Sequence, residues 1–158
     1  MAVLGPEEAF HLLVPSEVIS WEVAKIIRQA RSVFDADLEF VTEPGEAFSV
    51  DVAPMGASAT RVGVQSVRWE DVPLVQAAAL RGVEAIGGAG FDLLVPRTRR
   101  VVQIAARVEG DARAPLALAG VLASVLLAPI VPPDEITIYG LRGAHTRLAK
   151  RGWPQSAA

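Results

Sequence analysis

The sequence predicts an α+β fold, with a mixed or antiparallel sheet and helices packed on one of its faces. Short runs that alternate apolar and polar residues are separated by segments with the three- and four-residue apolar spacing of amphipathic helices. The order is β-α-β-β, then β-α-β-β, then an apolar helix and a final strand, which favours this architecture. With 158 residues, of which 51% are hydrophobic and 21% charged, the chain has the composition of one globular domain.

The first elements are a strand and a helix. Residues 10–15 form an apolar run that ends at a proline, as strands often do. Ser16 is expected to cap a helix that continues to about Phe34, because apolar residues recur along one stripe of this segment.

A hairpin with one wet face is expected next. Residues 36–42 and 47–53 alternate apolar and polar side chains around a Pro-Gly turn. The polar positions include Asp37, Glu39 and Asp51, so these carboxylates are expected to share a face. Clustered carboxylates hold divalent cations or act as acid–base pairs. The solvated face of a half-buried sheet has the same pattern, and we favour that interpretation and predict no metal site.

The second unit begins with a strand over residues 61–68. A helix follows, opened near Pro73 and ended by the glycine-rich residues 87–90. Phosphate loops open a helix, whereas these glycines follow one, so a helix C-cap is favoured over a phosphate site. Two apolar strands, 91–96 and 101–108, are expected to complete the unit.

Three arginines lie between these two strands, at the tip of the expected hairpin. Arg97, Arg99 and Arg100 are candidates for binding an anion or a partner, because the planar guanidinium matches carboxylates and phosphates. Solubilising turn charge is the more common role of such residues, although binding residues also concentrate in loops.

An uncharged segment spans residues 114–131. Pro115 fits the first turn of a helix and Pro129 ends it, which leaves a helix too short to cross a bilayer. A helix that is apolar all round is therefore expected in a core or a subunit interface. Leu122 and Leu126 are the predicted interface residues of this helix.

Residues 1–140 are expected to form a single domain, in which 10–53 and 61–108 make a pseudo-repeat and 135–141 form the last strand. The tail, 141–158, contains basic residues and no acidic one, so the rest of the chain is clearly acidic.

Three tail residues, Arg147, Arg151 and Trp153, are predicted interface contacts. Aromatic residues beside arginines are typical interface anchors, so we expect an acidic surface of this chain or of another subunit to order the tail. A frayed polar terminus is the alternative.

One segment, from Pro15 to Asp51, resembles the N-terminal half of the histidine-containing phosphocarrier protein of the sugar phosphotransferase system. The resemblance covers about a quarter of the chain and implies a related βαββ fold. That family's active histidine and its arginine correspond to Ile19 and Trp21 here, so phosphotransfer is not expected. The matching residues are Pro15, Ala24, Ile26, Ile27, Ala30, Phe34, Asp37 and Leu38.

Composition excludes several classes of function. The chain has no cysteine, only two histidines (His11 and His145) and a net charge of −3. This excludes thiolate metal sites, a cysteine nucleophile and a broadly basic nucleic-acid surface. His11 is expected to be structural, and no side chains form a catalytic constellation or call for a cofactor. The N-terminus lacks a signal peptide's pattern, so a cytoplasmic location is expected.

The leading hypothesis is a non-catalytic interaction or assembly subunit of a soluble complex, which self-associates and for which other protein subunits are also candidate partners. Neither nucleic acid nor a membrane is an expected partner. The second hypothesis is a small-molecule enzyme or effector-binding protein with an anion site at a subunit interface. The third is a degenerate phosphocarrier-like regulator.

Overall fold

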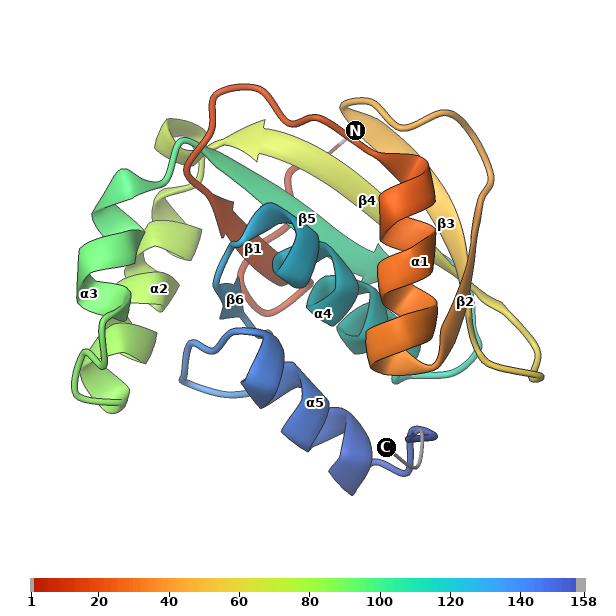
Figure 1. The fold of residues 1–158 in the computed structure, drawn as a ribbon. Coiled ribbons are helices and arrows are strands. Elements are labelled where there is room, and N and C mark those ends of the chain that lie inside the picture. The colour runs from red at the N-terminus through yellow and green to blue at the C-terminus, as the bar shows by residue number, and fades with distance from the viewer. Residues whose placement is uncertain (1, 156–158) are drawn as a thin grey trace.

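The computed structural model describes residues 2–155 and is built on one six-stranded sheet (Figure 1). Its strand order is β2-β3-β4-β5-β1-β6, and every pairing of neighbouring strands is antiparallel. An α+β fold is therefore confirmed. The strands are β1 (Phe10–Val14), β2 (Ala36–Phe40), β3 (Ala47–Pro54), β4 (Thr60–Arg68), β5 (Arg100–Ala106) and β6 (Ile130–Val131).

Helices cover both faces of this sheet. The helices are α1 (Val23–Phe34), α2 (Pro73–Ala85), α3 (Phe91–Leu94), α4 (Ala114–Leu126) and α5 (Leu141–Lys150), and two short 3₁₀ turns, η1 (Trp69–Asp71) and η2 (Val95–Arg97), flank α2 and α3. On one face, α4 lies between α1 and α5 (Figure 1). The pair α2 and α3 lies apart from them, toward the β1–β6 side of the sheet.

Alternation along the strands builds the main core. In β1, Leu12 and Val14 face α1 and α4, whereas Leu13 faces the opposite side of the sheet. In β5, Val102 faces the main core and Val101 the opposite side. The two periods, two in strands and 3.6 in helices, are why the apolar residues converge into cores.

The opposite face carries a second, smaller core. Leu13, Val101 and Val131 pack there against Val75 and Ala79 of α2. The expectation that all helices cover one face is thus wrong. Since β1 and β5 also carry apolar residues on this second face, Leu13 and Val101 among them, it needs a cover as well.

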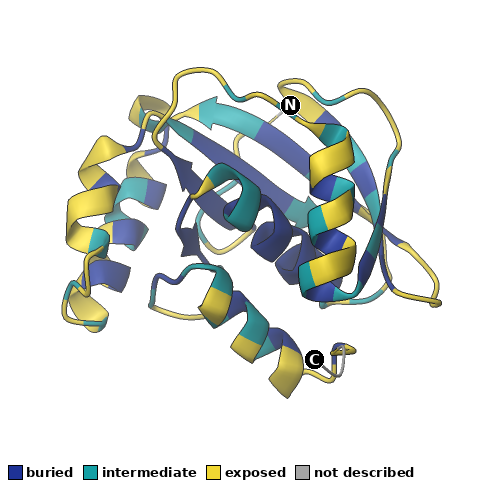
Figure 2. Ribbon diagram, viewed as in Figure 1, coloured by how far each residue is buried: buried dark blue, intermediate teal, exposed yellow. Residues whose placement is uncertain are grey.

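The apolar helix α4 is buried within the chain itself (Figure 2). Leu122 is fully buried in the main core, and Leu126 is half-buried against that core. Leu122 is therefore a core residue and not an exposed interface residue. The close packing depends on Gly120, where an added Cβ would lie 2.7 Å from the Phe34 ring and 3.1 Å from Ala144 of α5. No helix in the described part of the chain is long and apolar enough to span a bilayer.

Two expected strands are wrong. Residues 91–96 form α3 and the start of η2, so the second unit is not βαββ. Short apolar runs do not distinguish strand from helix, and Pro96 has no N–H for a ladder. In 135–141, Tyr139 makes only an isolated bridge to Ile130, since β6 itself has two residues.

The first helix also begins later than Ser16 predicts. It starts at Val23, with Glu22 as N-cap, and Ser16 lies in the preceding loop. Ile19 and Trp21 of that loop pack against the main core, a contact that replaces the extra helical turns.

Candidate functional site

The three arginines from 97 to 100 do not form a hairpin tip. They connect η2 to β5, and α2 and α3 separate β5 from its neighbour β4 along the chain. Arg97 is exposed, and Arg99 is exposed with its Nη1 3.2 Å from the Glu17 carboxylate. Arg100 is half-buried and lines a cleft to which neither Arg97 nor Arg99 contributes.

This cleft, named here the Arg100 cleft, has a volume of about 430 Å³ and is lined by Glu17, Ile19, Trp21, Glu46, Ser66 and Arg100, among others. Three parts of the chain meet there: the β1–α1 loop, the β2–β3 turn and the adjoining ends of β4 and β5.

Sequence reasoning missed Trp21, Glu46 and Ser66 as cleft residues. The signal that could have found Ser66 is the alternation of β4, where Val62 and Val64 face the core and Ser66 is the next residue on that side. A polar residue at the end of an apolar stripe marks where the covering helices stop.

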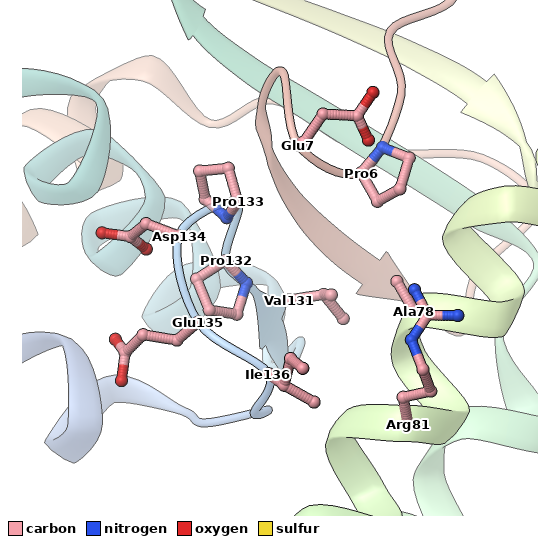
Figure 3. A pocket seen from close by; sticks show the side chains of 10 residues that line it. All are labelled: Pro6, Glu7, Ala78, Arg81, Val131, Pro132, Pro133, Asp134, Glu135 and Ile136. Carbon is pink, nitrogen blue, oxygen red and sulfur yellow. The ribbon is translucent and has the colours of Figure 1, made fainter.

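A second cleft of about 330 Å³ lies at the base of α2 (Figure 3). Pro132 and Pro133 stand on one side of it, and Arg81 of α2 stands on the other. Two of its three acidic residues, Asp134 and Glu135, are already paired with arginines of the α5 region, and the third is Glu7. We assign no ligand to this cleft.

The hairpin carboxylates lie on the open face of the sheet, as expected. Glu39 pairs in register with Asp51 on the face opposite the main core. Asp51 accepts from the Arg61 guanidinium at 3.0 and 3.2 Å, and Asp37 accepts from Arg31 at 3.1 Å. Among residues 2–155, no group of three or more potential ligands could hold a metal ion.

His11 is buried on the side of the sheet that faces away from α4. Its Nε2 lies 2.9 Å from Gln103 Nε2. The Gln103 side-chain amide also donates to the Leu4 carbonyl at 2.7 Å and accepts from the Leu4 N–H at 3.0 Å. Gln65 donates to Gln103 and to the Ala2 carbonyl. This cluster holds the N-terminal segment against the sheet. Desolvation lowers the His11 pKa to about 4, so the ring is neutral near pH 7.

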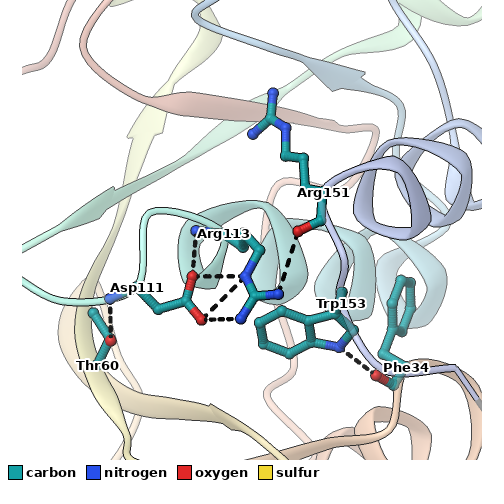
Figure 4. Close-up of polar contacts among 6 residues, drawn as sticks. All are labelled: Phe34, Thr60, Asp111, Arg113, Arg151 and Trp153. Carbon is teal, nitrogen blue, oxygen red and sulfur yellow. Dashed lines mark hydrogen bonds and ion pairs between the residues drawn. The ribbon is translucent and has the colours of Figure 1, made fainter.

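The tail is ordered by contacts within the chain (Figure 4). Trp153 is buried at 2% exposure, and its indole N–H donates to the Phe34 carbonyl at 2.7 Å. The Arg113 guanidinium lies 5.2 Å from the centre of the indole ring and is held by Asp111. Hydrogen bonds from Arg113 lower the Asp111 pKa. The frayed-terminus alternative is wrong for the described part of the tail; residues 156–158 lie outside the described residues.

The tail arginines meet acidic residues of the preceding loop. Arg147 bonds both Glu135 oxygens at 2.6 and 2.9 Å, and Arg151 bonds Asp134 at 2.7 Å. The bonds from Arg147 lower the Glu135 pKa. The acidic partner that we expected for the tail is therefore found on the same chain, and these contacts leave intersubunit use of Arg147 and Arg151 without support.

Comparison with protein-family models, with curated proteins and with solved structures found no match to this chain. A function must therefore be inferred from the geometry of the chain itself.

Proposed function

We propose that this chain is a non-catalytic interaction or assembly subunit that self-associates through the outer surface of α2 and α3, named here the α2–α3 surface. The supporting observation is that four leucines on these two helices are exposed to solvent. Figure 2 shows the outer sides of α2 and α3 largely as exposed. Single exposed apolar residues are common, but several on adjoining elements are typical of interaction surfaces. They are Leu74 at 68%, Leu80 at 61%, Leu93 at 67% and Leu94 at 44% exposure.

The charges of this surface fit a second copy of the chain. Arg81 and Glu84 are both exposed and lie about one turn apart on α2. Asp92 of α3 and Arg97 of η2 add a second pair of opposite signs. In a two-fold interface the same patch meets itself, so a patch that carries both signs is complementary to its own copy. The small net charge of −3 opposes association only weakly.

The surface proposed for self-association differs from the one that the sequence predicts. The apolar segment that suggested an interface is α4, which this chain covers itself. The α2–α3 surface, in contrast, is the side of these helices that faces away from the smaller core and into solvent. The proposal also includes a cytoplasmic location, which cell fractionation would test.

Light scattering of the purified chain tests the proposal. The expected mass in the micromolar range is a multiple of 16.7 kDa. Leu80→Asp combined with Leu93→Asp should reduce the mass to that of a monomer that still unfolds cooperatively, because both side chains are exposed in the single chain. Val108→Asp is the matched control, since Val108 is 57% exposed in the β5–α4 loop, outside α2 and α3.

Two results would reject this function: a wild-type monomer at all accessible concentrations, or an oligomer that survives the double substitution. Steeply salt-dependent binding to duplex DNA would instead favour a nucleic-acid partner.

A further inference from the structure

The Arg100 cleft begins where the core side of the sheet turns from apolar to polar. Val64 in β4 and Val102 in β5 are fully buried under the helices. Ser66 follows Val64 by two positions in β4, and Arg100 precedes Val102 by two positions in β5. Because the two strands are antiparallel, both residues lie on the same face at the same end of the sheet. A guanidinium at a core-facing position costs solvation free energy unless it meets polar groups or an open cleft.

Ser66 fixes the orientation of the Arg100 guanidinium. The Arg100 Nε–H donates to Ser66 Oγ at 2.9 Å, and Nη2 lies 3.4 Å from the Ser66 carbonyl. Among the described residues, Ser66 alone receives hydrogen bonds from this guanidinium. The fork has five N–H donors, so donors remain for a ligand, and their planar arrangement suits a carboxylate.

The cleft also supplies negative charge. The Ser66 N–H donates to the Glu46 carbonyl at 2.7 Å, which places the Glu46 backbone beside the arginine site. Glu46 is exposed at the cleft wall, whereas Glu17 on the opposite loop is engaged by Arg99. A carboxylate near a guanidinium in one cleft complements a ligand that carries both an ammonium and an anionic group.

An apolar wall completes the cleft. Trp21 and Ile19 are half-buried and pack against the main core. The Trp21 ring meets Phe48 edge to face, with 5.0 Å between ring centres, which limits its rotation. The volume of about 430 Å³ lies within the range of small-molecule sites.

We propose that the Arg100 cleft binds a small zwitterion of the amino-carboxylate class with an apolar side chain. Arg100 holds the carboxylate, Glu46 holds the ammonium, and Trp21 with Ile19 contacts the apolar group. This inference does not depend on self-association through α2 and α3, and it concerns different residues.

Calorimetric titration with three related probes tests the ligand class. L-phenylalanine carries both charges, 2-phenylethylamine lacks the carboxylate, and 3-phenylpropionate lacks the ammonium. Binding of L-phenylalanine at least tenfold tighter than that of either analogue is expected, because each analogue leaves one charged group of the cleft unpaired. Equal affinities for all three, or no binding of L-phenylalanine up to the millimolar range, would overturn the proposal.

Three variants locate the site. Arg100→Gln should weaken L-phenylalanine binding at least tenfold, and Glu46→Gln should remove the preference over 3-phenylpropionate. Arg97→Gln is the control, since it removes an exposed arginine of the same loop that does not line the cleft. Melting curves show whether Arg100→Gln is folded. Glu46 is exposed, so its substitution tests the site even if Arg100→Gln is unstable. Unchanged binding in Arg100→Gln, or unchanged preference in Glu46→Gln, rejects the assignment.

Discussion

Helices α2 and α4 have the same length and similar starts, yet they are buried to very different extents. Each has 13 residues, is rich in alanine, leucine and valine, and carries a proline in its first turn. In α4 ten residues are buried, but in α2 only four. The difference lies in their neighbours: α4 has the sheet beneath it and α1 and α5 on its flanks, whereas α2 packs on the sheet and α3 and leaves its outer side in solvent. Burial therefore depends on how many elements surround a helix as well as on its composition.

The largest expected effect contrasts one leucine from each helix. Leu122→Asp should abolish the cooperative folded state, since it places a charge in the dry main core and costs more than about 4 kcal/mol. At a protein concentration too low for self-association, Leu80→Asp should change the free energy of unfolding by less than about 0.5 kcal/mol, because Leu80 is exposed in the single chain. Urea denaturation followed by circular dichroism measures both. Similar losses in the two variants would contradict the comparison.

Truncating Trp153, the buried tail residue that packs in the main core with α4, should have the next largest effect. Trp153→Ala is expected to lower the free energy of unfolding by about 3–5 kcal/mol, because a buried indole is lost beside Phe34. Trp153→Phe should cost less, since it removes mainly the hydrogen bond to the Phe34 carbonyl. Gln155→Ala, two residues further along, is the control and should stay within about 0.5 kcal/mol. If Trp153→Ala behaved like the control, the tail would not contribute to closing the core.

Acid should act through the other face of the sheet. The His11 pKa is lowered from 6.5 to about 4 in the folded chain, so between these values the unfolded chain binds a proton that the folded chain does not. The free energy of unfolding should therefore fall by up to about 3 kcal/mol as the pH drops from 6.5 to 4. His11→Gln should flatten this dependence. A slope unchanged in that variant would assign the acid sensitivity to other groups.

The smallest expected effects concern one glycine in each helix. Gly82→Ala brings a methyl group against the main-chain carbonyl of Thr137, which must shift. Gly120→Ala meets side chains instead of the main chain, the Phe34 ring at 2.7 Å and the Ala144 Cβ at 3.1 Å. After the helix-propensity gain of about 1 kcal/mol, Gly82→Ala should still lose about 1–2 kcal/mol, and Gly120→Ala less. Thermal melting of the two variants tests this order, and the opposite order would show that the α4 packing is the stiffer of the two.

The sequence predicted those strands and helices that are long enough for the spacing of their apolar residues to distinguish one from the other. Prolines marked the ends of α4, and alternation gave the wet and dry faces of β2 and β3. Residues 91–96 failed because so short an apolar run has no distinct period. The burial of Leu122 followed from an all-round apolar helix, but the sequence did not say whether this chain or another would cover it.

The candidate site was harder to predict because its parts come from distant segments. Arg100 stood out by its charge, whereas Ser66 meets it only through the register of β4 with β5. Trp153 was expected to be buried against some surface, but its hydrogen-bond partner is a main-chain carbonyl, which no residue type reveals.

The position of β1 in the sheet has a consequence for folding during synthesis. This strand lies between β5 and β6, so the ribosome makes residues 10–14 long before either neighbour. Until residues 100–104 have emerged, β1 has no strand to pair with, and its apolar side chains remain uncovered in the nascent chain. Such distant pairing slows folding and prolongs exposure to aggregation. We therefore expect the sheet to close only near the end of translation, with β1 as the segment that depends longest on chaperone protection.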